Sequence, residues 1–195
     1  MEHDPMLIRE LHYQRFLGPL IQPVAHPTDD KVPHIDVYRF PPRKDRQHWT
    51  LITGGMSDAR QDVPADAPAF VSPRTELIMY VWEPKNWMLK ALMGLADMPF
   101  DDRSFLHYWH TASDNMPITE EPSFLTGYIF LPPFFEKEDF DTLQLLDEKV
   151  DILWVVPITD AELSYAMDKG AEALIDRFAE CDLHPVVNEE RASII

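Results

Sequence analysis

The sequence predicts an α+β fold: a single domain over residues 1–195 in which a mixed, mostly antiparallel sheet carries packed helices. A chain of 195 residues is long enough to bury one core without a metal or a disulfide. Apolar runs of strand length at residues 77–82, 128–131 and 152–156 are typical of buried strands. The segments beginning near residues 86 and 160 have helical spacing instead. No repeat or linker divides the chain, so one layered domain is the simplest architecture.

The first expected element is a helix over residues 4–17. Asp4 suits the N-cap, Pro5 suits the first helical position, and Gly18 and Pro19 end the helix. Four apolar residues follow at roughly helical spacing: Leu7, Ile8, Leu11 and Phe16.

A hairpin is expected after the proline-rich loop at residues 22–33. Residues 34–40 form its first strand, the charged residues 41–46 form its turn, and residues 49–53 pair back antiparallel. The run 77–82 is apolar at every position, so we expect a covering layer on each of its faces.

Two more helices are expected downstream. The first begins near Asn86 and ends at Pro99, because the residue before a proline disfavours helical geometry. The last begins at a capping box of Thr159 and Glu162 and runs on as one helix. One stripe of this last helix is expected to face the core: Leu163, Met167, Ala171, Leu174 and Phe178. Residues 100–115 show no clear pattern.

The net charge of −17, from 34 acidic and 17 basic residues, disfavours nucleic acid and anionic lipid as partners and favours basic proteins. Solubility alone is the plainer explanation of this charge. The single cysteine, Cys181, excludes an internal disulfide. We find no signal peptide and no apolar run long enough for a membrane span, and therefore expect a cytoplasmic protein.

The turn Gly54-Gly55-Met56-Ser57-Asp58 is the central candidate site. It lies between two predicted inner strands. A glycine-hinged turn at this place is expected to hold its three side chains at the mouth of a surface groove.

Enzymatic alternatives for this turn remain open. Ser57 comes near the G-x-S-x-G pattern of a hydrolase nucleophile, but a proline-broken loop at residues 59–73 stands where that pattern requires a helix. Glu76 with Asp58 could perform acid–base work if burial raised the pKa of Glu76. We favour a structural Glu76 that accepts hydrogen bonds from backbone at the end of the sheet.

His107 and His110 would share one face of a helix and could bind a metal in a small metal-dependent enzyme. Two ligands do not make a site, and no third is obvious beyond Asp114 or Glu120. We therefore expect no metal and no cofactor. Most of the five tryptophans should be core, and Trp109 is the best candidate for a surface anchor, although a place in the core is the plainer expectation for it too.

These segments resemble the suppressor of fused (SUFU) domain family. Residues 48–58 and 75–80 are similar to its aromatic-rich strand ending in G-[ML]-[ST]-D and the E-L strand that follows. Residues 87–96 resemble its W…L..LA helix, and Trp109-His110-Thr111 resembles a loop of the family that has a recurrent histidine. Residues 152–170 resemble its terminal strand and helix. The likeness covers about residues 30–180.

The resemblance implies a non-enzymatic protein-binding domain of the stand-alone, bacterial type. Such members are proposed as immunity proteins that neutralise polymorphic toxins, and an acidic surface would suit a basic toxin. The animal member clasps a transcription-factor segment with the help of a second domain. Its contacting Tyr and Asp align near Met98 and Trp109 and do not match, so that partner is not carried over.

The sequence thus predicts a protein-binding site at two segments, with no catalytic residues. Its residues are Gly54, Met56, Ser57 and Asp58 in the turn, and Trp109, His110 and Thr111 in the later loop. A self-associating structural subunit is a third alternative beside the binding domain and the small enzyme. The oligomeric state does not follow from the sequence.

Overall fold

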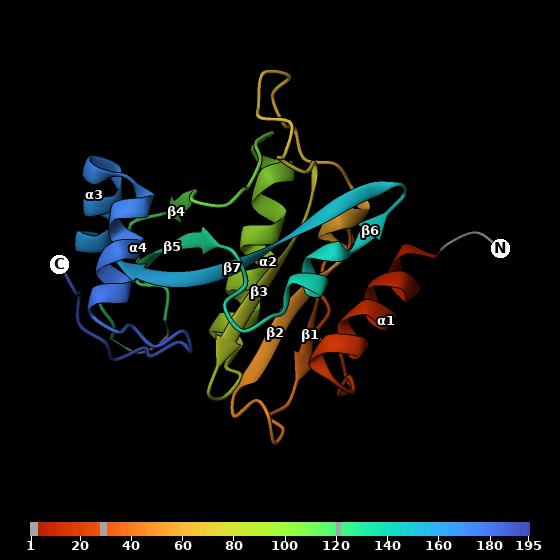
Figure 1. Ribbon diagram of the computed structural model, residues 1–195, viewed down its shortest axis with the longest axis horizontal. Helices are drawn as coiled ribbons and strands as arrows, with labels where there is room; N and C mark the ends of the chain where they lie inside the picture. The colour runs from red at the N-terminus through yellow and green to blue at the C-terminus, as the bar shows by residue number, and fades with distance from the viewer. Residues whose placement is uncertain (1–3, 28–30, 120–121) are drawn as a thin grey trace.

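The protein is described by a computed structural model that covers residues 4–27, 31–119 and 122–195 (Figure 1). The described strands are Asp36–Phe40 (β1), Trp49–Gly54 (β2), Arg74–Val81 (β3), Thr111–Ser113 (β4), Leu125–Leu131 (β5), Gln144–Leu145 (β6) and Glu148–Thr159 (β7). The α-helices are Pro5–Leu17 (α1), Asn86–Asp101 (α2), Asp160–Lys169 (α3) and Ala171–Glu180 (α4), and the 3-10 helices are Met56–Asp58 (η1) and Glu138–Thr142 (η2).

The strands form one sheet in the order β1-β2-β3-β7-β5-β4, and β6 pairs with β7. Neighbouring strands in this order are antiparallel except β3 and β7, where residues 74–78 run parallel to residues 150–154. The prediction of a mixed, mostly antiparallel sheet with helices packed on it is confirmed.

Both faces of the sheet are covered, as the all-apolar run in β3 predicts. Along β3, Ile78 and Tyr80 belong to the core under α1, α3 and α4, while Leu77 and Met79 belong to the core under α2. This alternation follows from the two-residue period of a strand. Helix α2 therefore lies on one face and the other α-helices lie on the opposite face (Figure 1).

Helix α1 has the predicted N-cap, Asp4. Arg9, Tyr13 and Leu17 are its buried residues, whereas Leu7 and Leu11 are exposed. Of the four apolar residues at helical spacing, Ile8 and Phe16 do pack against the core. The spacing of apolar residues did not indicate that Arg9 is buried on this face.

The boundaries of the later helices also differ from the prediction. Helix α2 continues two residues beyond Pro99, which lies in its last turn, and the Asp102 N–H still donates to the Met98 carbonyl oxygen. The predicted single C-terminal helix is two helices, because Gly170 adopts a φ of +94° between α3 and α4. Met167, within α3, faces solvent with 78% of its surface exposed, so its assignment to the core was wrong.

Candidate functional site

The glycine pair shapes the turn between β2 and η1. Gly55 has a φ of +115°, which favours glycine, and a Cβ at this position would lie 2.0 Å from the His34 carbonyl oxygen. A Cβ on Gly54 would lie 2.3 Å from the Tyr38 ring. The backbone therefore packs against β1 more closely than any side chain would permit.

The Glu76 carboxylate organises the whole turn from inside. One oxygen accepts from the Thr53 hydroxyl at 2.6 Å. The other accepts from the Gly55 N–H at 3.1 Å, the Ser57 N–H at 3.0 Å and the Ser57 hydroxyl at 2.5 Å. Glu76 is completely buried. It is the structural carboxylate that the sequence favoured, since its oxygens are occupied by the turn that it holds.

Arg9 of α1 neutralises this buried charge. Its Nε lies 3.6 Å from a Glu76 oxygen, and its guanidinium also donates to the Asp58 carboxylate and, at 3.3 Å, to the Ser57 hydroxyl. Burial alone would lower the Arg9 pKa, but the charges of Glu76 and Asp58 outweigh burial and raise it above its ordinary value. The turn is thus fixed to α1 as well as to β3.

This burial corrects the expected exposure of the turn. Met56 and Ser57 are fully buried, and Gly54 is buried, so their side chains and backbone do not form a contact surface. Asp58 is the predicted residue of the turn that reaches solvent, with 43% of its side chain exposed. A hydrolytic role for Ser57 gains no support, because its hydroxyl is closed off and donates to Glu76.

The second predicted segment lies against β5. The Trp109 N–H donates to the Phe130 carbonyl oxygen at 2.7 Å, and the Phe130 N–H donates to the His110 carbonyl oxygen at 3.0 Å. Trp109 has a φ of +73°, and 42% of its surface is exposed. His110 and Thr111 are half-buried, and Thr111 begins β4 at one edge of the sheet.

His107 and His110 do not share a helix face, since residues 104–110 are not helical. Their ring centroids are 6.3 Å apart, and burial lowers the pKa of both imidazoles. His107 lies 3.6 Å from the Asp151 carboxylate. Within the described residues neither histidine belongs to a group of three potential metal ligands.

Gln61, three residues after the turn, is bonded to Leu106, three residues before Trp109. Its side-chain amide donates to the Thr75 hydroxyl at 2.6 Å and to the Leu106 carbonyl oxygen at 3.3 Å, and its oxygen accepts from the Leu106 N–H at 2.7 Å. The loop that leaves Asp58 is therefore bound to the segment that leads into Trp109.

Sequence reasoning missed an aromatic cluster formed by His48, Tyr80, Phe134, Phe135 and Trp154. Phe135 stacks on the His48 ring at 4.3 Å between centroids, and Phe134 lies 5.7 Å from Trp154. Phe134 is exposed, whereas His48, Tyr80 and Trp154 are buried. The run Pro132-Pro133-Phe134-Phe135, directly after a predicted strand, was the signal in the sequence.

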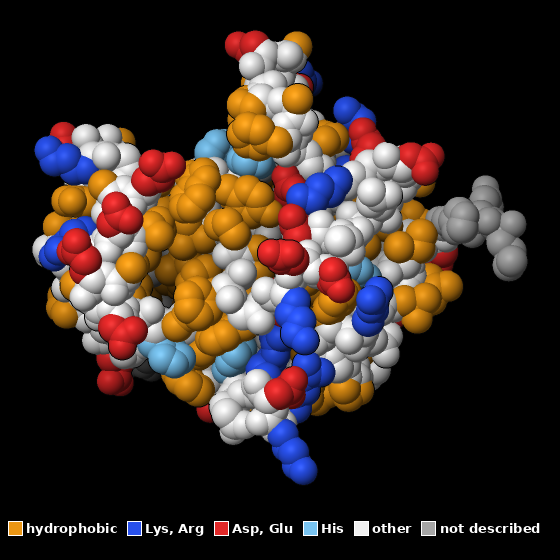
Figure 2. All heavy atoms as spheres, in the orientation of Figure 1, with side chains coloured by type: hydrophobic (Ala, Val, Ile, Leu, Met, Phe, Trp, Pro, Cys, Tyr) orange, Lys and Arg blue, Asp and Glu red, His pale blue; other side chains and the backbone are white. Residues whose placement is uncertain are grey.

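The surface carries a broad apolar hollow between α4 and the segment of η2 and β6 (Figure 2).

The tryptophans are divided between surface and core: Trp82 is more exposed than Trp109 and stacks on His184, while Trp87 and Trp154 are buried.

Within the described residues, no helix has both the length and the hydrophobicity that a transmembrane span requires.

Comparisons with known proteins agree with this architecture. A solved SUFU homologue from Neisseria gonorrhoeae FA 1090 is 17% identical, with a TM-score of 0.74, and the alignment covers 98% of this chain and 97% of that one. The structure named the Sufu-Fu complex is 15% identical, with a TM-score of 0.69, covering 97% of this chain and 92% of the other.

Drosophila Suppressor of Fused is 17% identical, with a TM-score of 0.56 over 82% of this chain and 42% of that protein. A search of curated proteins gives no match. The family model for the suppressor of fused protein (SUFU) matches residues 31–192, somewhat more of the chain than the resemblance covered. This chain is a member of the SUFU family.

Proposed function

We propose that this SUFU-family chain is a non-enzymatic domain that binds and inhibits a basic protein partner. Family membership over residues 31–192 carries the proposal, since a related fold occurs in a structure named as a complex of Sufu with Fu. The partner is of the kind that an immunity protein neutralises, a basic toxin domain. The protein acts in the cytoplasm and does not require nucleic acid, membrane or a cofactor.

The contact surface of this proposal consists of Asp58, Trp109, His110 and Thr111. Trp109 offers a large ring at the surface on a backbone that two hydrogen bonds hold to β5, which suits an anchor that becomes desolvated on binding. Asp58 offers a carboxylate to a cation of the partner. The buried residues Gly54, Met56 and Ser57 support this surface from below.

Charge supports a basic partner. The chain carries a formal net charge of −17, and complementary charge accelerates encounter and orients the two proteins. The association rate should therefore fall as salt is added, because screening acts on exposed charges. A partner bound mainly through apolar contact would not show this dependence.

The test is affinity purification from the native host with three forms of the chain: wild type, Trp109→Ala and Met167→Ala. Met167 is a matched control, since it is an exposed apolar residue on α3. We expect wild type and Met167→Ala to capture the same basic protein, and Trp109→Ala to bind it at least about thirtyfold more weakly, as loss of a central anchor does. Failure to recover any protein partner would contradict the proposal.

A further inference from the structure

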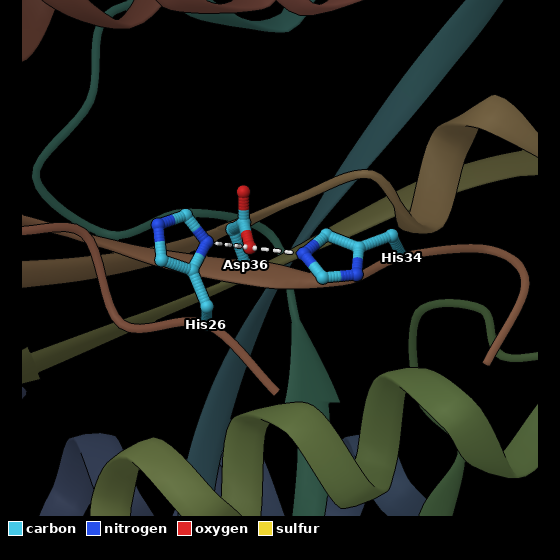
Figure 3. Close-up of side chains that lie close together, drawn as sticks. All are labelled: His26, His34 and Asp36. Atoms are coloured by element: carbon cyan, nitrogen blue, oxygen red, sulfur yellow. Dashed lines mark hydrogen bonds and ion pairs between the residues drawn. The ribbon is translucent and has the colours of Figure 1, made fainter. Parts of the chain in front are cut away.

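Three side chains with metal-binding atoms meet at the β1 edge of the sheet. His26 Nδ1 lies 2.6 Å from Asp36 Oδ1, and His34 Nε2 lies 3.1 Å from the same oxygen (Figure 3). One ligand atom from each residue lies within 4.8 Å of the other two. The imidazoles face the carboxylate from its two sides (Figure 3).

The backbone places these side chains together. Ala25 and Val37 exchange two hydrogen bonds, of 3.1 and 2.9 Å, in an isolated antiparallel bridge. Because the two segments run antiparallel, His26, which follows Ala25, lies beside Asp36, which precedes Val37. His34 lies two residues before Asp36 in extended chain, so both side chains project to the same side. The arrangement depends on fixed pairing rather than on a chance approach of long side chains.

We propose that His26, His34 and Asp36 form a binding site for one divalent transition-metal ion of the zinc class. Two imidazole nitrogens and one carboxylate oxygen suit Zn²⁺, Co²⁺, Ni²⁺ or Cu²⁺, whereas Mg²⁺ and Ca²⁺ prefer sites made of oxygen atoms. Three protein ligands leave the fourth position of a tetrahedral ion to water or to an external ligand.

The geometry needs only small side-chain movements to hold such an ion. With bonds of about 2.0 Å, two ligand atoms of a tetrahedral ion are about 3.3 Å apart. The 3.1 Å between His34 Nε2 and Asp36 Oδ1 already fits this value. The 2.6 Å between His26 Nδ1 and Asp36 Oδ1 must widen slightly, and the two imidazole nitrogens must move closer to each other. The imidazoles are 60% and 52% exposed, so they can rotate, while Asp36 is 14% exposed and is held by β1.

The site adjoins the backbone of the glycine turn. Asp36 is the register partner of Gly54, and the His34 carbonyl oxygen lies where a Cβ of Gly55 would be. An ion held by His26, His34 and Asp36 therefore fixes the start of β1, against which the turn packs. Since an ion that binds the folded state selectively stabilises it, metal should raise the thermal midpoint of unfolding.

The test uses protein from which every affinity tag has been removed, because a histidine tag would itself bind metal. Zn²⁺ is titrated by calorimetry into wild type, His26→Ala, His34→Ala, Asp36→Asn and the control His184→Ala. His184 is exposed and lies outside the group of three ligands. Circular dichroism without metal first verifies that each variant is folded, so loss of binding is not confused with loss of structure.

We expect one Zn²⁺ per chain in wild type and in His184→Ala, and an affinity reduced at least about tenfold in each of the other three variants. Co²⁺ should give the visible absorption of a low-symmetry site in wild type, and that absorption should disappear in the variants. Ca²⁺ should produce neither heat nor a change in thermal midpoint. Zinc binding that is absent in wild type, or equal in all variants, would overturn the proposal and leave the three residues as hydrogen-bonded surface groups.

Discussion

The Nε atom of Arg9 lies 3.6 Å from the Glu76 carboxylate, and both side chains are almost completely buried. One residue comes from the first helix and the other from an inner strand. Their pairing fixes the N-terminal helix against the sheet at the point where Glu76 also holds the Gly54-Gly55 turn. Removing one partner of a buried ion pair strongly destabilises the folded state, so substitutions at this pair test the described core directly.

Glu76→Gln should lower the free energy of unfolding by about 3–5 kcal/mol, because it leaves the Arg9 charge buried without its main counter-charge. Urea unfolding at neutral pH measures this loss. The double variant Arg9→Met/Glu76→Gln should cost about 1–3 kcal/mol less than the sum of the single changes. The exposed pair Arg177 and Glu180 is the control, and breaking it should cost no more than about 1 kcal/mol. Equal losses at both pairs would contradict the account.

Gly55→Ala should destabilise the fold by about 2 kcal/mol or more, since the turn requires a φ of +115° and a Cβ would meet the His34 carbonyl oxygen. Gly94→Ala is the matched control: Gly94 lies in α2, and a Cβ there has no neighbouring atom within 4 Å. That change should be neutral or stabilising by up to about 1 kcal/mol. Chemical denaturation of both variants checks the contrast, and a neutral Gly55→Ala would show that the turn is not constrained.

His48 should make the fold sensitive to mild acid. Burial against the Phe135 ring lowers the pKa of His48 to about 4 from its ordinary 6.5. The unfolded state therefore takes up a proton on residue 48 at a higher pH than the folded state does. The free energy of unfolding is consequently at its full value above pH 6.5, as far as His48 is concerned, and it falls as the pH drops toward 4. The loss is at most about 3 kcal/mol.

Unfolding of wild type and His48→Gln in urea at pH 7 and pH 5 checks this expectation. The variant should lose less stability than wild type over this interval, because its residue 48 does not titrate. Comparing the two proteins removes the contribution of the many carboxylates that both share. An identical loss in both would mean that His48 is not the responsible group.

Gln61→Leu should loosen the connection between the Asp58 loop and the Trp109 segment. The Gln61 oxygen accepts from the Leu106 N–H at 2.7 Å, so that amide should exchange with deuterium faster in the variant. Stability should fall by about 1–3 kcal/mol, the cost of leaving buried partners unsatisfied. Gln47→Leu is the control, because Gln47 is exposed and bonds only to backbone in its own turn among the described contacts. Unchanged exchange at Leu106 would exclude the link.

Local patterns in the sequence were sufficient for most of the fold. The unbroken apolar run of β3, the hairpin of β1 and β2 and the capping box of Thr159 and Glu162 all agree with the structure. Errors occurred where a distant contact overrides a local pattern. The spacing of apolar residues indicated helix α1, but it does not reveal that Arg9 is buried beside Glu76 while Leu7 and Leu11 are exposed.

The site was harder to predict for the same reason. Gly54-Gly55 correctly indicated a tight turn, but the sequence does not reveal that Glu76 draws Ser57 inward and leaves Asp58 outside. The grouping of His26 with His34 and Asp36 depends on the bridge between Ala25 and Val37, which no local pattern encodes.

Photo-crosslinking in the native host tests the proposed binding surface most directly. A benzoylphenylalanine is placed at position 109 or, as the control, at the more exposed position 167, and crosslinked proteins are identified after irradiation. The account predicts that position 109 captures one basic protein and that a lysine in place of Asp58 abolishes this capture, while position 167 captures none. No specific product at position 109, or the same products at both positions, would contradict it.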